Sequence, residues 1–145
     1  FHEFDMIFVA TKFHKELLLE NSITPNTGAI ADKIYITGLP FYATEFVPAK
    51  QKENIVVFPH RIAKEKHPEM FDCFSNLPFA KDYKFIKTIE HTVGREDYFK
   101  MLEKSKIMLS FADQETFGYS TLEAMALGNI VIVPNKLSSK ETVPA

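Results

Sequence analysis

The chain has 145 residues, the length of one domain or of one domain with part of a neighbour. Hydrophobic residues make up 46% and charged residues 25%, a composition typical of folded globular proteins that argues against disorder. The formal net charge of −2 offers no basic excess to hold a nucleic-acid backbone, so we expect no nucleic-acid partner. No apolar run approaches the ~20 residues needed to span a bilayer. The single cysteine, Cys73, rules out an internal disulfide and fits a reducing compartment.

The first part of the chain predicts a strand, a helix and a second strand. Residues 6–10 form a short apolar run typical of a buried strand, and Thr11 is a suitable N-cap for a helix over about residues 12–20. Residues 21–28 are rich in Asn, Ser, Thr, Pro and Gly and predict a loop. Residues 34–37 then predict the second strand.

Residues 48–53 are the best candidate for a linker. They begin with Pro48 and continue into a charged stretch, a composition that favours an exposed connection between two domains. The chain starts with Phe1 and ends soon after an apolar run that resembles a core strand, although core strands seldom lie at the edge of a domain. We therefore expect a piece of a longer polypeptide.

The part of the chain after the linker alternates between apolar strands and amphipathic helices. The predicted strands are residues 54–58, 83–88, 107–111 and 130–133. Continuous apolar runs of this kind suit parallel strands covered on both faces. The apolar positions of the three intervening helices are Met70, Phe71, Phe74 and Leu77, then Tyr98, Met101 and Leu102, and last Leu122, Met125 and Ala126. This alternation predicts an α/β fold with a Rossmann-like, doubly wound parallel sheet.

A basic loop, residues 59–66, follows the first of these predicted strands. Ligands of open parallel sheets bind beyond the carboxyl ends of the strands. Arg61 and Lys66 lie five residues apart in this loop, so both cations could converge on one phosphate, Arg as a planar fork and Lys as a point charge. The alternative interpretation is a solvated basic loop without a ligand.

A second loop leads into the helix predicted over residues 120–127. Gly118 allows a ligand to approach the backbone closely, and the amides from Gly118 to Thr121 favour an anion at the start of the helix. Glu123 lies about one turn into the helix and could accept hydrogen bonds from ribose hydroxyls. The alternative is that Glu115 and Glu123 are ordinary surface carboxylates.

The segment ETFGYSTLEAMALGNIVIVP, residues 115–134, resembles the signature of the group 1 family of retaining nucleotide-sugar glycosyltransferases, which have the GT-B fold. That signature has two glutamates separated by seven residues, Phe-Gly soon after the first, and Glu-Ala-Met-Ala-x-Gly from the second. The family also places an Arg and, five residues later, a Lys after the first strand of its C-terminal domain, as at Arg61 and Lys66. Two departures put the geometry of this loop in question, because His60 and His67 stand where the family usually has glycine.

The resemblance implies a division of the chain into two domains. Residues 1–47 correspond to the tail of the N-terminal, acceptor-side domain, and residues 48–53 correspond to the linker. Residues 54–145 correspond to the C-terminal, donor-binding domain, which we expect to be truncated. Because most of the acceptor side is missing, we expect the isolated chain to be inactive as an enzyme.

The resemblance also implies the reaction and its residues. A hexosyl group would pass from a nucleotide-diphosphate sugar, with UDP or GDP as the nucleotide, to an unidentified glycan, lipid or protein acceptor with retention of configuration. No metal or cofactor is expected, and none of the five histidines has the spacing of metal ligands. The catalytic residues would be Arg61, Lys66 and Glu115. The donor-binding residues would be His60, His91, Phe117, Gly118, Tyr119, Ser120, Thr121 and Glu123, with the loop of residues 89–93 touching the base. We expect a cytoplasmic protein. Peripheral association with a membrane, through parts of the polypeptide that this chain lacks, stays open.

Three other interpretations stay open. A GT-B epimerase or a phosphorylase-like enzyme would bind the same kind of ligand, although the two spaced glutamates favour a transferase. A non-catalytic, doubly wound binding module would need an acidic cluster at the strand ends, which the sequence does not show. The chain could also bind a nucleotide without having any activity of its own.

Overall fold

The computed structural model describes residues 3–22 and 27–144 of the chain. These residues form two compact units, which are described separately. One unit, here called the N-terminal unit, contains residues 1–41, 115–118 and 136–145, and the other, the sheet unit, contains residues 42–114 and 119–135. Residues 115–118 and 136–145 group with the N-terminal unit, although we expected them in the donor-binding domain. Compact units of this kind do not by themselves define the boundaries of domains. The division at residues 48–53 therefore stays a prediction.

The N-terminal unit is built on two short parallel strands. Strand β1 (Ile7–Val9) pairs with β2 (Ile34–Ile36), with Ile7 opposite Ile34. Helix α1 (Lys12–Glu20) is confirmed with its predicted cap, since the Thr11 hydroxyl accepts a hydrogen bond from the backbone N–H of His14 at 3.1 Å. Short helices α2 (Thr27–Ala31) and α7 (Ser139–Thr142) complete the unit.

The prediction of a loop over residues 21–28 needs a correction. Residues 23–26 lie outside the described part of the chain. Helix α2 begins at Thr27, so the loop ends earlier than the composition predicts. The helix is favoured because it places Ile30 against Val9 and Ile34 in the small core of this unit, and such burial outweighs weak local propensity.

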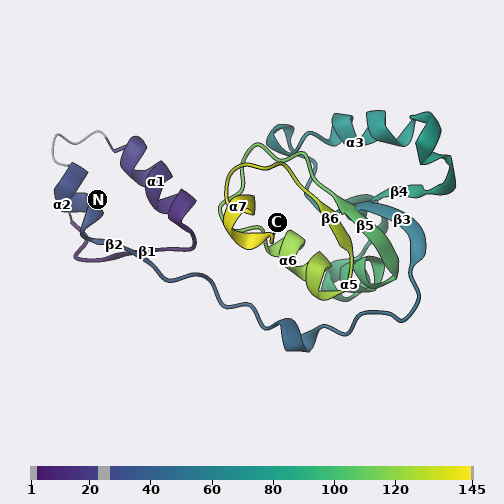
Figure 1. The fold of residues 1–145 in the computed structure, drawn as a ribbon, viewed down its shortest axis with the longest axis horizontal. Helices are drawn as coiled ribbons and strands as arrows, with labels where there is room; N and C mark the ends of the chain where they lie inside the picture. Colours follow the sequence, from purple (N-terminus) through teal and green to yellow (C-terminus); the bar gives the residue numbers. More distant parts are fainter. Residues whose placement is uncertain (1–2, 23–26, 145) are drawn as a thin grey trace. The chain divides into compact units, whose positions relative to one another are not determined.

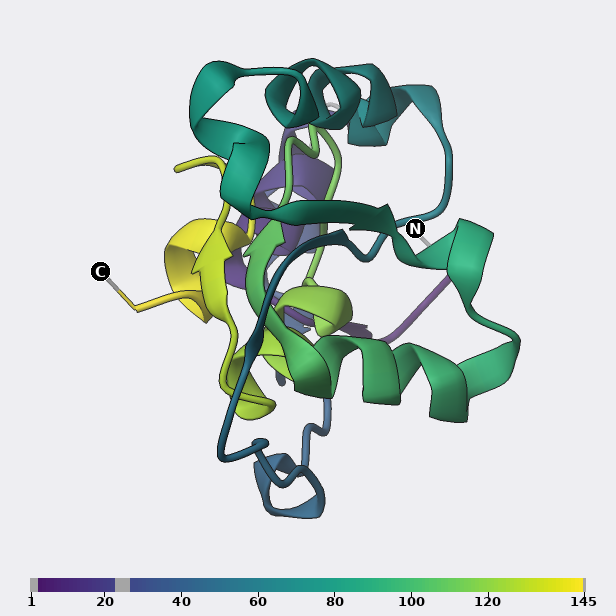
Figure 2. The same ribbon diagram turned by 90° about the vertical axis from the view of Figure 1, so that its right-hand side faces the viewer.

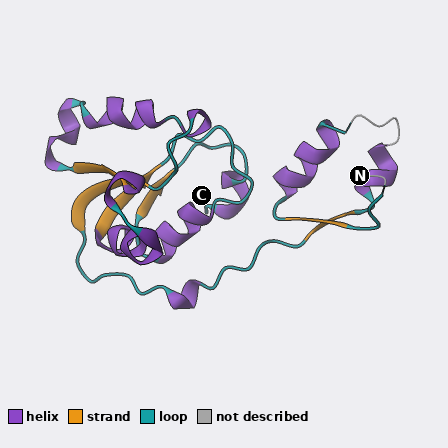
Figure 3. Cartoon of the chain, turned by 180° about the vertical axis from the view of Figure 1, so that it is seen from behind, coloured by secondary structure: helices purple, strands orange, loops and turns teal. Residues whose placement is uncertain are grey.

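The sheet unit contains the predicted parallel sheet. Its strands are β3 (Glu53–Phe58), β4 (Lys84–Lys87), β5 (Ser105–Leu109) and β6 (Ile130–Ile132), in the spatial order β4-β3-β5-β6. All three neighbouring pairs are parallel (Figures 1 and 3). The α/β fold with a parallel sheet is therefore confirmed.

Helices cover both faces of this sheet. Helix α3 (Pro68–Ser75) lies on one face, and α5 (Gly94–Lys104) and α6 (Tyr119–Ala126) lie on the other (Figures 1 and 2). The shorter elements are α4 (Thr88–His91) and the 3-10 turns η1 (Ala43–Glu45), η2 (Lys64–Lys66) and η3 (Pro78–Asp82). Residues 89–91 are thus helical rather than the expected loop.

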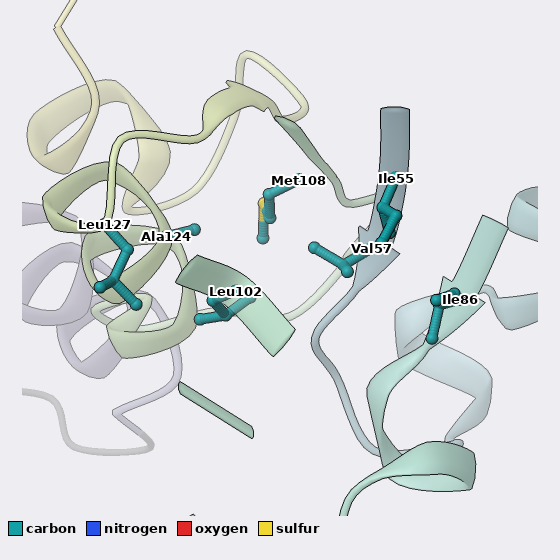
Figure 4. Close-up of a cluster of buried hydrophobic side chains, with 7 residues drawn as sticks. All are labelled: Ile55, Val57, Ile86, Leu102, Met108, Ala124 and Leu127. Carbon is teal, nitrogen blue, oxygen red and sulfur yellow. The ribbon is translucent and has the colours of Figure 1, made fainter. Parts of the chain in front are cut away.

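The alternation of side chains along β3 divides the core into two layers. Val56 and Phe58 point to the α3 face and pack with Phe71. The opposite cluster faces α5 and α6 and consists of Ile55, Val57, Ile86, Leu102, Met108, Ala124 and Leu127 (Figure 4). Both faces of β3 are buried from Ile55 to Phe58, which explains why this stretch is continuously apolar and does not alternate with polar residues.

Two predicted helix faces are corrected by the structure. In α6 the buried residues are Thr121 and Ala124, not the predicted Leu122, Met125 and Ala126, which are half-buried. In α3 Phe71 is buried as expected, but Met70 is exposed, and Leu77 lies beyond the end of the helix and is exposed as well. The reason is geometric, because a helix packed on a sheet buries the stripe that faces the strands and not every apolar side chain on it.

Within residues 3–22 and 27–144, no helix combines the length and the apolar character needed to cross a bilayer.

Candidate functional site

The candidate site lies at the carboxyl ends of β3, β4 and β5. The chain leaves β3 toward β4 on one side and returns to β5 on the other, so the strand order reverses between β3 and β5. At such a switch point the loops that follow the two strands diverge and leave a crevice where ligands bind. The basic loop follows β3, and residues 110–114, here called the β5 loop, follow β5.

A cavity of about 330 Å³ opens at the carboxyl ends of β3 and β4. Its lining comes from the basic loop, from α4 and from the start of α5, and consists of Pro59, His60, Arg61, Thr88, Ile89, Thr92, Gly94, Arg95 and Tyr98. The structure thus brings His60 and Arg61 together with the segment that we expected to touch a base. Ile89 and Thr92 line the cavity, whereas His91 is exposed at the end of α4.

The two cations of the basic loop each have a partner. The Arg61 guanidinium donates to the Glu65 carboxylate at 2.5 Å, and its side chain is 73% exposed. A hydrogen bond with its own backbone, together with the Arg61 guanidinium, lowers the pKa of Glu65. The Lys66 ammonium donates to the carbonyl of Gln114 in the β5 loop at 2.5 Å. Convergence of both cations on one phosphate stays a prediction.

Both histidines that flank these cations contact the β5 loop. His60 is 7% exposed, its Nε2 is hydrogen-bonded to Ser110 Oγ at 2.7 Å, and its ring meets the Phe58 ring edge to face. His67 is hydrogen-bonded to Asp113 through Nε2 and to Glu69 through Nδ1. From the sequence we could not predict how these histidines affect the geometry of the loop. In the structure their side chains form hydrogen bonds to the β5 loop.

Glu123 lies half-buried on α6 beside α5. Its Oε2 accepts a hydrogen bond from the Tyr98 hydroxyl at 3.0 Å, and its Oε1 lies 3.8 Å from Arg95 Nη2. Burial raises the pKa of the Glu123 carboxyl, although Tyr98 and Arg95 oppose the shift. Burial and the adjacent carboxylate also raise the pKa of Tyr98 well above its ordinary value, so its hydroxyl stays protonated and donates. Glu123 is thus a fixed acceptor and not a loose surface carboxylate.

The turn before α6 belongs to the N-terminal unit. Glu115 Oε1 accepts hydrogen bonds from the backbone N–H groups of Thr116 at 3.2 Å and Gly118 at 3.1 Å. The Gly118 N–H is thus already paired with Glu115, and its contact with a diphosphate stays a prediction. Gly118 has φ of +89°, which explains the glycine at this turn. The proposed contact of Glu115 with a transferred sugar stays a prediction, as does the donor contact of Phe117.

The first residues of α6 differ in exposure. Tyr119 is 41% exposed and Ser120 is half-buried, whereas Thr121 is 7% exposed and faces the core. The helix therefore presents Tyr119 and Ser120 more openly than Thr121. Among the described residues, no group of three or more His, Cys, Asp or Glu side chains is arranged to hold a metal ion.

Sequence reasoning missed several residues at this site. Tyr98 was assigned only to an apolar helix face, but its hydroxyl reaches Glu123. Arg95 and Asp113 were not singled out, although they pair with Glu123 and His67 respectively. One signal was present, because Arg95 is a cation directly after Gly94, at the start of a predicted helix.

No protein-family model matches the chain. The curated alpha-1,6-glucosyltransferase of Actinobacillus pleuropneumoniae serotype 7 (strain AP76) is 27% identical over 135 residues, which cover 90% of this chain and 38% of that protein. The tRNA-queuosine alpha-mannosyltransferase of Drosophila melanogaster is 35% identical over 92 residues, which cover 63% of this chain and 24% of that protein. The chain thus spans well under half the length of these relatives.

Solved structures share the fold. A crystal structure of a TarM variant from S. aureus, in complex with fondaparinux, alpha-GlcNAc-glycerol and UDP, matches with a TM-score of 0.75 at 17% identity and covers 99% of this chain and 33% of that one. A glycosyltransferase from Rickettsia africae ESF-5 matches with a TM-score of 0.64 at 18% identity, covering 97% of this chain and 47% of that one. The class that these findings define is the GT-B glycosyltransferase fold. This chain has the fold of a part of such proteins, and glycosyltransferases are its curated relatives.

Proposed function

We propose that the chain is the donor-binding part of a retaining, metal-independent glycosyltransferase of the group 1 family. The observation that carries the proposal is the site at the switch point. The loop that contains Arg61 and Lys66 comes directly after β3, and helix α6 contains Glu123, a hydrogen-bond acceptor with a fixed orientation. The curated relatives support a glycosyl transfer reaction. Both of their names specify an alpha product. A transferase that retains the configuration of an alpha-linked nucleotide sugar forms such a product.

In this proposal Arg61 and Lys66 bind the diphosphate. The leaving group carries negative charge that must be stabilised as the bond to the sugar breaks. Arg61, Lys66 and the start of α6 supply positive charge, roughly half a unit of it from the helix dipole, and the Glu65 carboxylate paired with Arg61 offsets part of it. Arg61 keeps further N–H donors beyond the one that Glu65 accepts, because a guanidinium has five. A charged loop of this kind can do the work that a divalent metal does elsewhere.

Glu123 binds the ribose. One carboxylate oxygen accepts from Tyr98 at 3.0 Å, so the carboxylate has a fixed orientation and retains further acceptor capacity for a hydroxyl. The cavity beside Ile89 and Thr92 holds the base, and His60 and Tyr119 contribute to the donor site. The backbone N–H groups of Ser120 and Thr121 donate near the diphosphate at the start of α6, and His91 contacts the base from the rim.

Glu115 orients the transferred hexosyl group. We favour a front-face reaction, in which the bond from the anomeric carbon to the diphosphate oxygen breaks and the acceptor oxygen bonds to the same face. The acceptor proton then passes to the departing diphosphate oxygen, so charge and atoms balance. The favoured donors are UDP or GDP sugars. The acceptor is a glycan, a lipid or a protein, and the enzyme works in the cytoplasm, with peripheral membrane association open.

The alternatives differ in their chemistry. A GT-B epimerase or a phosphorylase-like enzyme would bind the same donor class without transfer to a glycan, and a bare nucleotide-binding fragment would not turn over a donor. The names of the curated relatives favour transfer over the first two.

A ligand panel with EDTA present tests the proposal. We expect UDP or GDP and the corresponding nucleotide sugars to raise the melting temperature of the chain, because a ligand that binds only the folded state stabilises it by mass action, about 2.7 kcal/mol at a hundredfold excess over Kd. ADP serves as the matched control nucleotide. A chain that none of these ligands stabilises, or that needs Mg²⁺ or Mn²⁺ to respond, would contradict the proposal.

A further inference from the structure

Four hydrogen bonds across the switch point tie the basic loop, together with His67 directly after it, to the β5 loop. His60 Nε2 and Ser110 Oγ lie 2.7 Å apart, and the backbone N–H of Asp113 donates to the Glu65 carbonyl at 2.8 Å. The Lys66 ammonium donates to the Gln114 carbonyl, and His67 is hydrogen-bonded to Asp113. Three of the four ties involve residues 65–67, so the end of the basic loop is where the two loops are held.

His67 adopts a backbone conformation that residues with a Cβ rarely use. Its φ is +52° and its ψ is +56°, in the left-handed region. Pro68 follows and starts α3, and a proline disfavours the right-handed helical conformation of the residue before it. A strained residue persists only where its surroundings hold it in place. The side-chain contacts of His67 restrain it together with two backbone hydrogen bonds, from the His67 N–H to the Lys64 carbonyl at 3.2 Å and from the Met70 N–H to the His67 carbonyl at 3.1 Å.

Both ring nitrogens of His67 are paired with carboxylates. Nδ1 lies 2.9 Å from Glu69 Oε1 in the first turn of α3, and Nε2 is hydrogen-bonded to Asp113 Oδ2 in the β5 loop. Only the protonated imidazolium donates from both nitrogens. The hydrogen bonds to Asp113 and Glu69 raise the pKa of His67, with burial opposing them. Lys66 and Glu65 in η2 are the charged residues next to His67 along the chain. On α3, the negative charge of Asp72 raises the pKa of Glu69.

We propose that His67 is a positioning residue of the phosphate site, whose imidazolium clasps the basic loop to the β5 loop and so holds Lys66 where the diphosphate binds. Lys66 is the adjacent residue and bonds to Gln114, the neighbour of Asp113, so the clasp and the lysine share the same two loops. The proposal rests on the proposed role of Lys66 in binding a diphosphate. It predicts that the site loosens as pH rises and His67 loses its proton.

The sign of the pH effect follows from the direction of the shift. Because the folded state holds the proton more tightly than the unfolded chain, the clasp is complete below the ordinary titration range of histidine and is lost as pH rises through the raised pKa. A neutral imidazole donates from one nitrogen only, so its second nitrogen then faces a carboxylate without a proton between them.

The functional arm measures affinity by calorimetry at about pH 6 and about pH 8, a range in which histidine titrates and the uracil and guanine bases of the probes do not. The probes are UDP-glucose and GDP-mannose, whose diphosphates are diesterified and lack the phosphate titration near about pH 6 of a free nucleotide. We expect the affinity of the unmodified chain to fall roughly three- to tenfold between these two conditions. His67→Gly accepts the left-handed backbone without strain and removes the imidazole that forms the clasp. This variant should bind three- to tenfold more weakly at about pH 6 and show no further loss at about pH 8.

Two further variants separate positioning from general destabilisation. Asp113→Asn removes the carboxylate partner in the β5 loop and should flatten the pH profile in the same way, whereas Glu96→Gln removes an exposed carboxylate of the Glu96–Lys100 pair on α5 and should leave the profile unchanged. In a Lys66→Met background, His67→Gly should cause no additional loss, because the two residues act as one unit. Equal pH profiles of His67→Gly and the unmodified chain, or additive losses in the double variant, would overturn the proposal.

A structural arm keeps the two proposals distinguishable. Amide hydrogen exchange reports the order of residues 65–67 and 111–114 without any ligand. We expect His67→Gly to lower the protection of both segments at about pH 6 while the melting temperature changes little. If the unmodified chain binds neither nucleotide sugar, the proposed function fails while the clasp still stands on the exchange data. Unchanged protection in His67→Gly would overturn the clasp itself.

Discussion

Lys66 and Arg61 show how single residues acquire a role from their partners. Lys66 donates to a backbone carbonyl and Arg61 to a carboxylate, so both side chains are oriented before any ligand arrives. Pre-oriented cations cost less to arrange at the moment of reaction than mobile ones. The same two residues were visible in the sequence as a spaced pair, but their partners were not.

We predict that Arg61→Ala and Lys66→Ala each slow transfer from a nucleotide sugar by roughly two to three orders of magnitude, because each removes stabilisation of the departing diphosphate. The measurement is the initial rate of nucleoside diphosphate release in a form of the protein that turns over its donor. Lys104→Ala, a cation at the far end of α5, is the matched control and should keep the parental rate. Rates within a few-fold of the parent for both site variants would contradict the prediction.

Glu123 offers a second test at this scale. Glu123→Gln should weaken nucleotide binding by about 1–3 kcal/mol, because the neutral amide accepts ribose hydroxyls less strongly than a carboxylate. Tyr98→Phe should cost less, roughly 0.5–1.5 kcal/mol, since it removes only the hydroxyl that orients the carboxylate. Calorimetry with ribonucleotide and 2′-deoxyribonucleotide checks both, and the preference for ribose should shrink in each variant. An unchanged preference in Glu123→Gln would rule out the ribose role.

The same substitution has an opposite effect on stability. Burial raises the pKa of Glu123, so the folded state binds this proton more tightly than the unfolded chain, and the contribution of the group to stability is lost as pH rises through the raised pKa. Glu123→Gln removes this penalty and keeps an acceptor for Tyr98. The melting temperature of Glu123→Gln minus that of the parent should therefore increase as the pH rises from about 4 to about 8. A difference that stays constant over this range, followed by calorimetry, would contradict the assigned burial effect.

At the scale of elements, the end of α6 is set by Gly128. Its φ of +79° permits two hydrogen bonds that close the helix, from the Gly128 N–H to the Met125 carbonyl and from the Asn129 N–H to the Ala124 carbonyl, both at 2.9 Å. This closure returns the chain directly into β6. A Cβ at this position would lie 3.1 Å from the Cβ of Pro48, so glycine also makes room for the segment before β3.

We predict that Gly128→Ala lowers the free energy of unfolding by about 1–3 kcal/mol, combining left-handed strain with the close approach to Pro48. Gly94→Ala is the matched control, because Gly94 has φ of +84° but nothing within 4 Å of its added Cβ. The control should therefore show the strain alone. Denaturant unfolding of both variants measures the difference, and equal losses would mean that the contact with Pro48 contributes nothing.

At the scale of the whole sheet unit, the two core layers hold the strand ends in register. Leu102 and Met108 are fully buried between the sheet and helices α5 and α6, and Phe58 and Phe71 fill the opposite layer. Arg61 and Lys66 lie on the loop that follows β3 and Glu123 lies on α6, and both of these elements are anchored in the two layers. The site therefore depends on a packed core for its geometry, although no core residue belongs to it.

We predict that Leu102→Ala destabilises the sheet unit by about 2–5 kcal/mol, as expected for a cavity in a core with no solvent access. Thermal and denaturant unfolding measure the loss. Leu122→Ala, a half-buried leucine on α6, is the control and should cost less. An equal loss in both variants would show that burial does not determine the effect.

Much of the fold was accessible from local patterns. The cap at Thr11, the strand at residues 54–58 and the glycine that ends α6 follow from residue types and their immediate neighbours. The helix of residues 27–31 and the helical turn at residues 88–91 were missed because packing against the rest of the unit decides them. The buried stripe of α6 was misjudged for the same reason, since the sheet selects Thr121 and Ala124 for burial.

The sequence alone determined the parallel α/β organisation and the positions of Arg61, Lys66, Glu115 and Glu123, because hydrophobic periodicity and motif spacing act over short stretches of chain. Only the tertiary structure decided which groups these residues meet. The partners of His60, His67 and Glu123 lie 50, 46 and 25 residues away. They become neighbours because strands distant in sequence align in one sheet, and hydrogen bonding depends on distance in space and not on separation along the chain.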